Sequence, residues 1–390
     1  MIAIKLEITN QTSDEYYMKR ALELAVRGDG FVNPNPRVGA VIVKNGNVIG
    51  EGYHQRFGEL HAERNALRSC TEDPAGSTVY VTLEPCCHYG KTPPCTEALI
   101  AAKPARVVVG SDDPNPKVAG KGIRILRDAG IEVVRGFMKE ECDAINGVFF
   151  RYITTGLPTV TMKYAMTADG KIATVTGKSK WISSEASRTR ENAERGHTMS
   201  IMVGVGTVLP DDPMLTCRDG KGLSPTRIIC DTNLRTPLSA AVIRTASDAE
   251  SEGGNEMRTP QTILATAVSE EERLAPYREK GAEILILPKG EDGRIDLRAL
   301  LQELGKRQID TVLVEGGGTL NASCLKQQIA DRVRIYIAPK LFGGAGARTP
   351  VEGAGIDEPS DCPRLRSPKI TGSGGDLLIE SEVEYVHRNH

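Results

Sequence analysis

The chain has 390 residues, enough for two domains of ordinary size or three smaller ones. Its 49 basic and 51 acidic side chains give a formal net charge of −2, and the sequence pI is about 6.4. This balance and an aromatic content of 4% disfavour the basic, aromatic-rich surface that nucleic-acid binding needs, so we expect a small-molecule substrate.

The N-terminal half predicts an alternating α/β domain. Residues 1–7 break their apolar run with charges, and no stretch of about 18 uncharged apolar residues follows, so we expect neither a signal peptide nor a membrane span, and a cytoplasmic location. Asn45-Gly46 predicts a two-residue hairpin turn. Helices are expected over 13–27, 61–70, 96–102 and 121–129, and strands over 38–44, from 48 onward, and over 78–83, 106–110 and 131–135.

A second α/β domain is expected beyond residue 150, so the predicted domains are 1–150 and 151–390. A helix over 139–152 leads out of the first domain, and Gly156-Leu157-Pro158 interrupts the chain. Residues 247–260 and 351–376 are rich in Gly, Ser, Pro and acidic residues, which predicts surface loops. Strands are expected over 159–164, 200–205, 226–231, 262–266, 283–287, 311–315 and 333–338.

The strongest functional signal is His61-Ala62-Glu63, followed by Pro85-Cys86 and, after eight further residues, by Cys95. The other cysteines are scattered, which does not fit a disulfide framework. One imidazole and two thiolates form a ligand set that zinc prefers, and sites with three protein ligands are typically catalytic. His61 and Cys95 are both expected where helices begin, and the positive ends of helices favour a thiolate.

Glu63 is the expected proton carrier of this site. Zinc lowers the pKa of a bound water to about 7, and a carboxylate beside it can take the water's proton and pass it to a ring nitrogen and to departing ammonia. His-x-Glu followed by Pro-Cys and a second Cys is the signature of zinc-dependent base deaminases, in which the Glu is catalytic and not a ligand. The gap from Cys86 to Cys95 is longer than in that signature. Alternatively, Cys87 or His88 completes a closed structural zinc site in an interaction module without catalysis.

Residues 33–41, 61–63 and 84–95 resemble the deaminase half of the bifunctional deaminase-reductase of riboflavin biosynthesis. The Gly-Lys-Thr-Pro-Pro-Cys ending of the long loop distinguishes that family from cytidine and transfer-RNA deaminases. The resemblance implies a cytidine-deaminase-like three-layer α/β/α domain and a contact from Asn35 to the pyrimidine, although the Asn-Pro context of Asn35 also fits a simple turn. Cys87 departs from the family pattern, which usually has a small hydroxyl residue there.

Two glycine-rich turns follow apolar strands in the C-terminal half, at residues 204–206 and 316–318. Such turns let backbone N–H groups and a helix N-terminus approach phosphate, but either one alone also fits a tight connection. The usual dinucleotide fingerprint is absent, because Asn321 stands where the third glycine would be. Two such turns in one domain favour a bound dinucleotide.

Together with residues 163–171 and 181–184, these turns resemble the reductase half of the same family, which implies a dihydrofolate-reductase-like α/β fold that binds NADPH. Arg195 and Arg218 could each hold a phosphate ester with a guanidinium fork, or be surface charges. The NADPH contacts that the resemblance implies are Ala165, Trp181, Thr207, Asp211, Thr232, Gly317, Gly318, Thr319, Leu320, Asn321, Ala322 and Ser323. The substrate contacts that it implies are Ser179, Arg195, Leu215, Arg218 and Glu315.

The implied function is a pair of consecutive reactions on one phosphorylated pyrimidine. The N-terminal domain would use zinc to deaminate C2 of 2,5-diamino-6-(5-phosphoribosylamino)pyrimidin-4(3H)-one, and the C-terminal domain would reduce the ribosyl chain to ribityl with NADPH. The resemblance also implies a homo-oligomer, a dimer or a tetramer. A base or nucleoside deaminase with an unrelated C-terminal domain is the alternative, which the long loop between Cys86 and Cys95 and the low pI disfavour.

Overall fold

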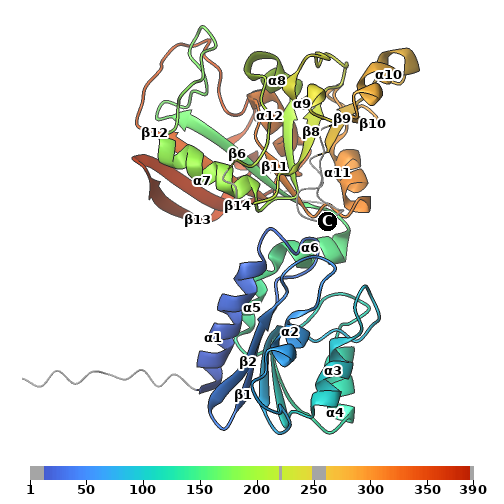
Figure 1. Cartoon of the computed structure of the whole chain (residues 1–390). Coiled ribbons are helices and arrows are strands. Elements are labelled where there is room, and N and C mark those ends of the chain that lie inside the picture. Colours follow the sequence, from blue (N-terminus) through green and yellow to red (C-terminus); the bar gives the residue numbers. More distant parts are fainter. Residues whose placement is uncertain (1–12, 219–221, 248–260, 387–390) are drawn as a thin grey trace, which may run out of the picture. The chain divides into compact units, whose positions relative to one another are not determined.

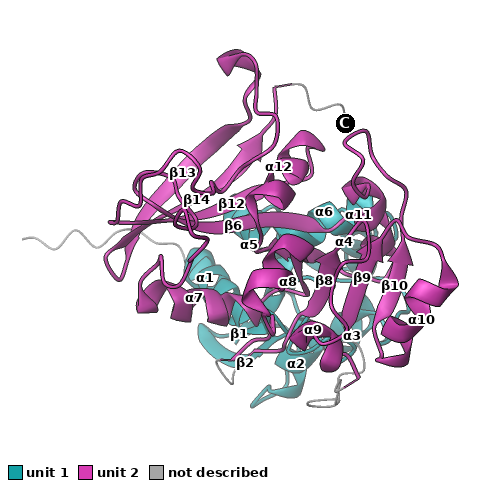
Figure 2. Cartoon of the chain, turned by 90° about the horizontal axis from the view of Figure 1, so that it is seen from above, with its two compact units in different colours: residues 1–155 teal, residues 156–390 magenta. Residues whose placement is uncertain are grey.

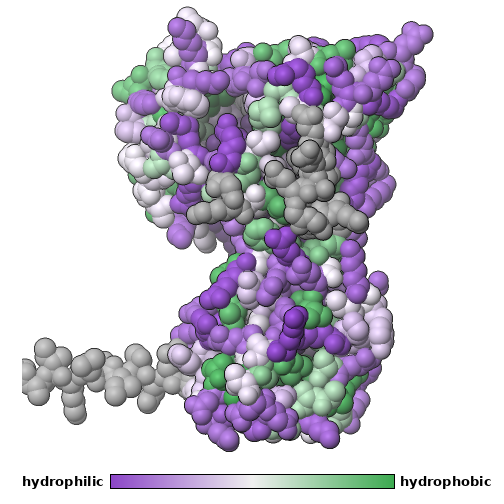
Figure 3. Space-filling model, viewed as in Figure 1, coloured by the Kyte–Doolittle hydropathy of each residue, from purple (hydrophilic) through white to green (hydrophobic). Residues whose placement is uncertain are grey.

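The computed structural model describes residues 13–218, 222–247 and 261–386, and the chain divides into two compact units, residues 1–155 and 156–390 (Figures 1 and 2). Apart from Ser247, the loop expected over 247–260 lies outside the described residues. None of the helices within these ranges is long and apolar enough to cross a membrane. On the face seen in Figure 3, hydrophilic residues are spread over both units, with hydrophobic ones in small groups between them.

Unit 1 is built on a five-stranded sheet with the order β2-β1-β3-β4-β5. Strands β1 and β2 form the expected hairpin, and both of its turn residues, Asn45 and Gly46, have positive φ, as this type of turn requires. Strand β1 is antiparallel to β3, and β3, β4 and β5 are parallel. The strands are β1 (Gly39–Lys44), β2 (Asn47–Tyr53), β3 (Thr78–Leu83), β4 (Arg106–Ser111) and β5 (Glu132–Arg135).

Helices cover both faces of this sheet, which gives three layers (Figure 1). Alternate strand residues such as Val41 and Val108 pack with α1 and α5, and their neighbours such as Ile42 and Val107 pack with α2, α3 and α4. The helices are α1 (Ser13–Ala25), continued by the 3-10 turn Val26–Gly28, α2 (Ala62–Arg68), α3 (Cys95–Ala102), α4 (Lys121–Asp128), α5 (Lys139–Ile145) and α6 (Gly147–Thr155).

The single helix predicted over 139–152 is wrong, because the chain breaks between α5 and α6 at Asn146. The Asn146 side chain accepts a hydrogen bond from the Arg37 N–H and donates one to the Arg37 carbonyl, both at 2.9 Å. An Asn that bonds the backbone of another segment competes with helix continuation. The break therefore ties the end of α5 to the segment before β1.

Unit 2 contains a nine-stranded sheet with the order β10-β9-β8-β7-β11-β6-β12-β14-β13. The strands from β10 to β12 in this order are parallel, and β14 and β13 are added antiparallel to that edge. The strands are β6 (Thr159–Thr167), β7 (Ser200–Gly204), β8 (Thr226–Cys230), β9 (Thr262–Thr266), β10 (Glu283–Ile286), β11 (Thr311–Val314), β12 (Arg332–Ala338), β13 (Arg364–Ser373) and β14 (Asp376–Glu384).

The parallel part of this sheet also has a core on each face. Met202 and Val312 belong to the core that contains α11 and α12, whereas Ile201 and Val203 belong to the core that contains α8, α9 and α10. The helices of unit 2 are α7 (Glu185–Arg195), α8 (Val205–Asp211), α9 (Ala241–Arg244), α10 (Glu271–Glu279), α11 (Leu297–Lys306) and α12 (Gly318–Lys326), with a 3-10 turn at Pro359–Asp361.

The loop predicted over 351–376 is wrong in its second half, where the structure has β13. This strand lies at the sheet edge and pairs with β14 alone, and its residues from Arg364 to Ile370 are exposed. Burial on one face is what produces an alternating apolar pattern, so an exposed edge strand gives the sequence no such signal. A register shift between Arg366 and Lys369 further interrupts the strand.

Candidate active sites in the two units

Three metal-binding side chains of unit 1 converge where two helices begin. His61 is the N-cap residue of α2, Cys95 is the first residue of α3, and Cys86 lies in the loop after β3. His61 Nδ1 lies 3.4 Å from the sulfur of Cys86 and 3.4 Å from that of Cys95. All three ligand atoms lie within 4.8 Å of one another, so one ion could contact all of them.

The donor set fits zinc in both chemistry and spacing. Tetrahedral coordination with Zn–S near 2.3 Å and Zn–N near 2.0 Å separates the N and S ligand atoms by about 3.5 Å, close to the 3.4 Å found here. Thr92 Oγ1 lies 3.5 Å from His61 Nε2, and such a partner fixes the orientation of a metal-binding imidazole. Within the described ranges the group has three ligands, the number typical of catalytic zinc.

Cys87 and His88, the residues considered for a closed site, are not part of this group. The Cys87 sulfur lies 3.6 Å from the Lys117 carbonyl oxygen, in the loop before α4. Burial raises the pKa of the Cys87 thiol, and the nearby Glu84 carboxylate adds to that shift. Both effects disfavour a thiolate at this position, whereas a metal ligand has to be one.

Electrostatics at the three ligands favour a thiolate beside the imidazole. The hydrogen bond between the two thiols lowers the pKa of Cys86 and raises that of Cys95, and His61 lowers the pKa of Cys86 further. Burial alone would lower the pKa of His61, but Cys86 and Glu63 raise it overall. The protonation states of His61, Cys86 and Cys95 are therefore interdependent, since the charge of each residue shifts the pKa of its neighbours.

Glu63 lies in the first turn of α2, and 3% of its surface is exposed. Burial raises the pKa of its carboxyl group, and the negative charge of Cys86 adds to the shift. A carboxyl pKa displaced toward neutrality suits a group that must accept a proton and return it.

Helix α2 is in direct backbone contact with β2. A Cβ atom added at Gly50 would lie 2.5 Å from the Ala66 carbonyl oxygen, and one added at Gly52 would overlap the backbone of Ala66 and lie 2.7 Å from the Ala62 carbonyl oxygen. Only glycine at these two strand positions allows the helix to approach so closely. His61 and Glu63 are thus carried by an element that packs directly against the sheet.

Asn35, the residue expected at the pyrimidine, is connected to the metal group through His54. The His54 Nδ1 lies 3.1 Å from the Leu60 carbonyl, which can only accept a hydrogen bond, so Nδ1 carries the proton. His54 Nε2 then accepts from the Asn35 amide nitrogen, 3.1 Å away. Burial lowers the pKa of His54 to about 4, which keeps this ring neutral. The His54 and His61 ring centroids are 5.2 Å apart.

His54, and also Glu84 and Asp113 near Cys86, were not predicted as site residues from the sequence. The Glu84 carboxylate accepts hydrogen bonds from the N–H groups of Gly120 (2.9 Å) and Ile123 (3.2 Å), which anchors the loop that carries Cys86 to α4. Burial raises the pKa of Asp113 to about 6, and the negative charges of Glu84 and Cys86 add to this. His54 and Asp113 lie outside the motifs, so nothing in the sequence singles them out. Glu84 begins the motif at residues 84–95, but its spacing does not indicate that it anchors this loop.

In unit 2 the two glycine-rich turns lie side by side and border one cavity. A Cβ atom added at Gly316 would lie 3.2 Å from Val203 Cα and 3.4 Å from the Gly204 nitrogen, so the turns after β7 and β11 approach each other through glycine. The cavity measures about 210 Å³. The residues expected to contact NADPH that line it are Thr207, Thr232, Gly317, Gly318, Thr319, Leu320 and Ser323.

The other residues expected at NADPH lie elsewhere in unit 2. Ala165 is in β6, opposite Tyr336 of β12, and Asp211 ends α8. Trp181 is 61% exposed, with the Arg188 guanidinium 4.4 Å from the centre of a Trp181 ring. The buried Asn321 donates a side-chain hydrogen bond to the Pro350 carbonyl (2.8 Å), and Ala322 lies one residue further along α12. The structure thus leaves these five residues outside the cavity.

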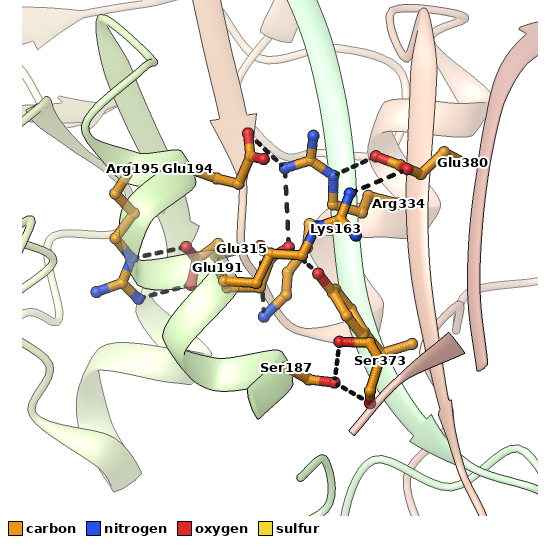
Figure 4. A network of polar contacts seen from close by, with 11 residues as sticks. Lys163, Ser187, Glu191, Glu194, Arg195, Glu315, Arg334, Ser373 and Glu380 are labelled. Carbon is orange, nitrogen blue, oxygen red and sulfur yellow. Dashed lines mark hydrogen bonds and ion pairs between the residues drawn. The ribbon is translucent and has the colours of Figure 1, made fainter. Parts of the chain in front are cut away.

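Of the residues expected at the substrate, Arg195 and Glu315 contact each other. Arg195 Nε and Nη2 donate to the two Glu315 oxygens, both at 2.8 Å (Figure 4). Arg195 Nη1 donates to the Thr216 carbonyl. The guanidinium fork that sequence analysis expected at phosphate is therefore used by Glu315. Burial alone would raise the pKa of Glu315, but Arg195 lowers it to about 2. Half-buried Ser179 lies in the loop before α7, whereas buried Leu215 and exposed Arg218 lie in the loop between α8 and β8.

This ion pair belongs to a larger buried polar network, which includes Lys163 and Glu191 (Figure 4). The Lys163 Nζ lies 4.0 Å from a Glu191 oxygen, and its positive charge also lowers the pKa of Glu315. Tyr336 donates to the other Glu191 oxygen at 2.6 Å. Arg334 joins Glu191 to the acidic residues Glu194 and Glu380. Neither Lys163 nor Glu191 was predicted from the sequence to have a role in the site.

Comparison with known families gives two matches that lie one in each unit. Residues 11–111 match the cytidine and deoxycytidylate deaminase zinc-binding region, and residues 158–379 match the RibD C-terminal domain. The riboflavin biosynthesis protein RibD of Actinobacillus pleuropneumoniae is 49% identical over 371 residues, which cover 95% of this chain and 96% of that protein. The match to a RibD C-terminal domain disfavours the alternative of an unrelated second domain.

Solved structures show the same similarity over both units. Acinetobacter baumannii RibD has a TM-score of 0.83 at 35% sequence identity, and the match covers 95% of this chain and 99% of that one. The Thermotoga maritima diaminohydroxyphosphoribosylaminopyrimidine deaminase/5-amino-6-(5-phosphoribosylamino)uracil reductase has a TM-score of 0.82 at 38% identity, with the same coverage of both chains.

Proposed function

Because the chain belongs to the RibD family of riboflavin biosynthesis enzymes, which are both deaminases and reductases, we propose a specific reaction for each unit. Unit 1 hydrolyses the amino group from C2 of 2,5-diamino-6-(5-phosphoribosylamino)pyrimidin-4(3H)-one. Unit 2 then uses NADPH to reduce the ribosyl side chain of the product to ribityl. The convergence of His61 with Cys86 and Cys95, at 3.4 Å from each sulfur, is the observation that carries this proposal.

In the deamination, His61, Cys86 and Cys95 hold one zinc ion, and Glu63 moves the protons. Bound zinc lowers the pKa of water to about 7 and so supplies the hydrolytic nucleophile at neutral pH. The Glu63 carboxylate would take one proton from the attacking water and pass it to the pyrimidine ring nitrogen as the bond from the water oxygen to C2 forms. It would then take the remaining proton from the new hydroxyl group and pass it to the amino group, so that the C2–N bond breaks, ammonia leaves and C2 becomes a carbonyl. The raised pKa of Glu63 supports this role, because the same group has to accept and to donate.

Asn35 orients the pyrimidine in this scheme, and His54 orients Asn35. Since the Asn35 amide nitrogen donates to His54, its carbonyl oxygen is the atom that accepts a hydrogen bond from an N–H group of the substrate. His54 is a positioning residue, because it acts through Asn35.

In the reduction, the nicotinamide ring supplies the hydride. The cavity-lining residues Thr207, Thr232, Gly317, Gly318, Thr319, Leu320 and Ser323 hold the dinucleotide in this proposal, with Ala165, Trp181, Asp211, Asn321 and Ala322 as further contacts. Glu315, kept ionised by Arg195, accepts hydrogen bonds from the substrate beside Ser179, Leu215 and Arg218. Exposed Arg218 binds the substrate phosphate in this proposal, since the Arg195 fork is occupied.

Substitution of His61 by alanine separates the two activities. We expect His61→Ala to lose zinc and ammonia release, and to retain NADPH oxidation with the deaminated intermediate. Metal content, ammonia release and NADPH absorbance measure these three quantities. Cys87→Ser is the matched control and retains zinc, because Cys87 is outside the ligand group. Loss of both activities in a folded His61→Ala protein would contradict the proposal.

The remaining expectations concern partners and location. We propose that the chain acts on small molecules in the cytoplasm and assembles as a dimer or a tetramer. Sedimentation velocity of the full chain tests the assembly, and a single monomeric species at micromolar concentration would contradict it.

A further inference from the structure

The cavity beside the glycine-rich turns of unit 2 is strongly basic. Arg235, Arg294 and Arg348 line it, and all three are exposed. The one acidic residue that lines it, Glu352, accepts a hydrogen bond from the Thr319 hydroxyl at 2.9 Å. The three arginines therefore provide more positive charge than is needed to neutralise a diphosphate group alone, which indicates a ligand with a further anionic group.

The strand order indicates which part of a dinucleotide each arginine faces. The turns after β11, β7 and β8 lie at the same edge of three adjacent parallel strands. Helix α12 begins after β11, where its N-terminus favours the diphosphate. Ala165 and the Glu315 ion pair lie on the β6 and β11 side, and Arg235 lies beyond β7, after β8. A dinucleotide with its reactive half near Glu315 extends its adenosine half toward Arg235.

The backbone that carries Arg235 is fixed by buried hydrogen bonds. One oxygen of the fully buried Asp231 carboxylate accepts from the N–H of Arg235, from the N–H of Thr236 (2.6 Å) and from the Thr236 hydroxyl (2.8 Å). The Tyr277 hydroxyl donates to the Thr236 carbonyl at 2.6 Å. The main chain at Arg235 is thus held while its side chain reaches the cavity.

Arg294 is brought to the same end of the cavity by a contact between two loops. The N–H of Ile295 donates to the Thr232 hydroxyl at 3.2 Å, which places the loop after β10 beside the turn after β8. Arg294 has a loose ion pair with Asp292, at 3.8 Å. Two guanidinium groups therefore lie on the adenosine side, while Arg348 belongs to the loop that passes over the start of α12.

We propose that Arg235, assisted by Arg294, binds the 2′-phosphate of the adenosine ribose and selects NADPH over NADH. This inference rests on the proposed reductase function of unit 2. A phosphate monoester adds about two negative charges and three acceptor oxygens, and a guanidinium fork matches it with two parallel hydrogen bonds. NADH differs from NADPH by this one group, so selection between them depends on the residues that contact it.

Calorimetric titration of the full chain with fragments of the cofactor tests this directly. The probes are 2′,5′-ADP and 5′-AMP, followed by NADPH and NADH. The wild-type chain should bind 2′,5′-ADP more tightly than 5′-AMP. Arg235→Ala should weaken binding of 2′,5′-ADP and NADPH by about tenfold to a hundredfold, the usual effect of losing a charged hydrogen bond. Binding of 5′-AMP and NADH should stay within about twofold.

Arg364→Ala is the matched control, because Arg364 is exposed on β13 and does not line the cavity. It should bind all four ligands as the wild type does. An Arg235→Ala chain that loses NADPH and NADH affinity equally, or loses neither, overturns the inference, as does a wild-type chain that does not discriminate between the two fragments. A wild-type chain that binds neither dinucleotide refutes the proposed reductase function itself.

Discussion

Glu315 and Arg195 are opposite charges that are both largely withdrawn from water, with side chains 11% and 15% exposed. Removing two ions from water costs about as much as their attraction returns, so such a pair is rarely retained for stability alone. Its geometry fixes the Glu315 oxygens beside the glycine-rich turns that line the cavity, since Glu315 directly precedes Gly316. Folding stability alone therefore does not explain the pair, which is consistent with the substrate contact that we propose for Glu315.

Removal of one partner from this pair should destabilise unit 2 strongly. Glu315→Ala leaves the Arg195 charge buried without its partner, which costs about 3–5 kcal/mol. Urea unfolding followed by fluorescence measures this, because Trp181 is the only tryptophan and lies in unit 2. The double substitution Arg195→Met with Glu315→Leu should cost less than Glu315→Ala, and an equal or larger cost would contradict the argument.

The same carboxylate predicts a pH dependence. Because Arg195 lowers the pKa of Glu315 to about 2, its contribution to stability is complete above the unfolded-state pKa, near 4.3. The contribution is lost as the pH falls from there toward 2. The difference in unfolding free energy between wild type and Glu315→Gln should thus be constant from pH 7 to 5.5 and shrink below that range. A difference that grows on acidification would have the wrong sign.

Within the candidate sites, the metal-binding and acid-base residues that stand at characteristic spacings could be predicted from the sequence. His61, Glu63, Cys86 and Cys95 stand at spacings that chance seldom produces, and the structure brings them together. His54 has no such context, and its contact with Asn35 depends on a strand and a loop that meet only in the folded chain. The partner of Arg195 could not be predicted either, since Glu315 is 120 residues away.

At the scale of elements, the start of α12 has little room for a side chain. A Cβ atom added at Gly318 would overlap the Thr349 carbonyl oxygen and lie 2.5 Å from Glu352 Cγ, whereas one added at Gly206 in α8 would meet no atom within 4 Å. Close packing therefore requires glycine at position 318 but not at position 206, although both glycines lie in glycine-rich turns at the same cavity.

This difference can be measured as stability. Gly318→Ala should destabilise unit 2 by about 1–3 kcal/mol, because the turn or the loop over it has to shift. Gly206→Ala should be neutral or stabilising by up to about 1 kcal/mol, because alanine is the better helix residue. Trp181 fluorescence during urea unfolding reports both values. Equal destabilisation by the two substitutions would contradict the packing argument.

Elements with one buried face were predictable, and those without one were not. The strands of the parallel sheet in unit 2 are rich in buried β-branched residues, and their prediction needs no tertiary information. Strand β13 has no buried face from Arg364 to Ile370, and the break between α5 and α6 depends on the bond between Asn146 and Arg37. Both features are determined by contacts with distant segments.

At the scale of the whole molecule, the predicted fold class is confirmed. The family matches and the similar structures support a cytidine-deaminase-like α/β/α unit followed by a RibD reductase unit. The alternation of strands and helices predicted two α/β domains. The type of each fold came from the resemblance, because periodicity alone does not distinguish one α/β topology from another.

Removal of zinc should affect one unit and spare the other. A chelator should abolish ammonia release while NADPH-dependent reduction of the deaminated intermediate persists. In thermal unfolding, the transition of unit 1 should fall by more than about 5 °C, because a bound ion stabilises only the fold that holds it. Trp181 fluorescence should show an unchanged transition for unit 2. Equal shifts of both transitions would contradict independent sites.

The glycines of β2 let the helix that carries His61 and Glu63 pack directly on the sheet, which holds these two residues more rigidly than a loop would. Because no side chains lie between Gly50 or Gly52 and the backbone of α2, the helix cannot shift along the strand by rearranging side-chain rotamers. His61 and Glu63, for which we propose metal binding and proton transfer, thus share the same rigidly held helix start, and any distortion of it would disturb both proposed functions together. Mutants that uncouple these two properties should accordingly arise in the loop of Cys86 and seldom in the helix.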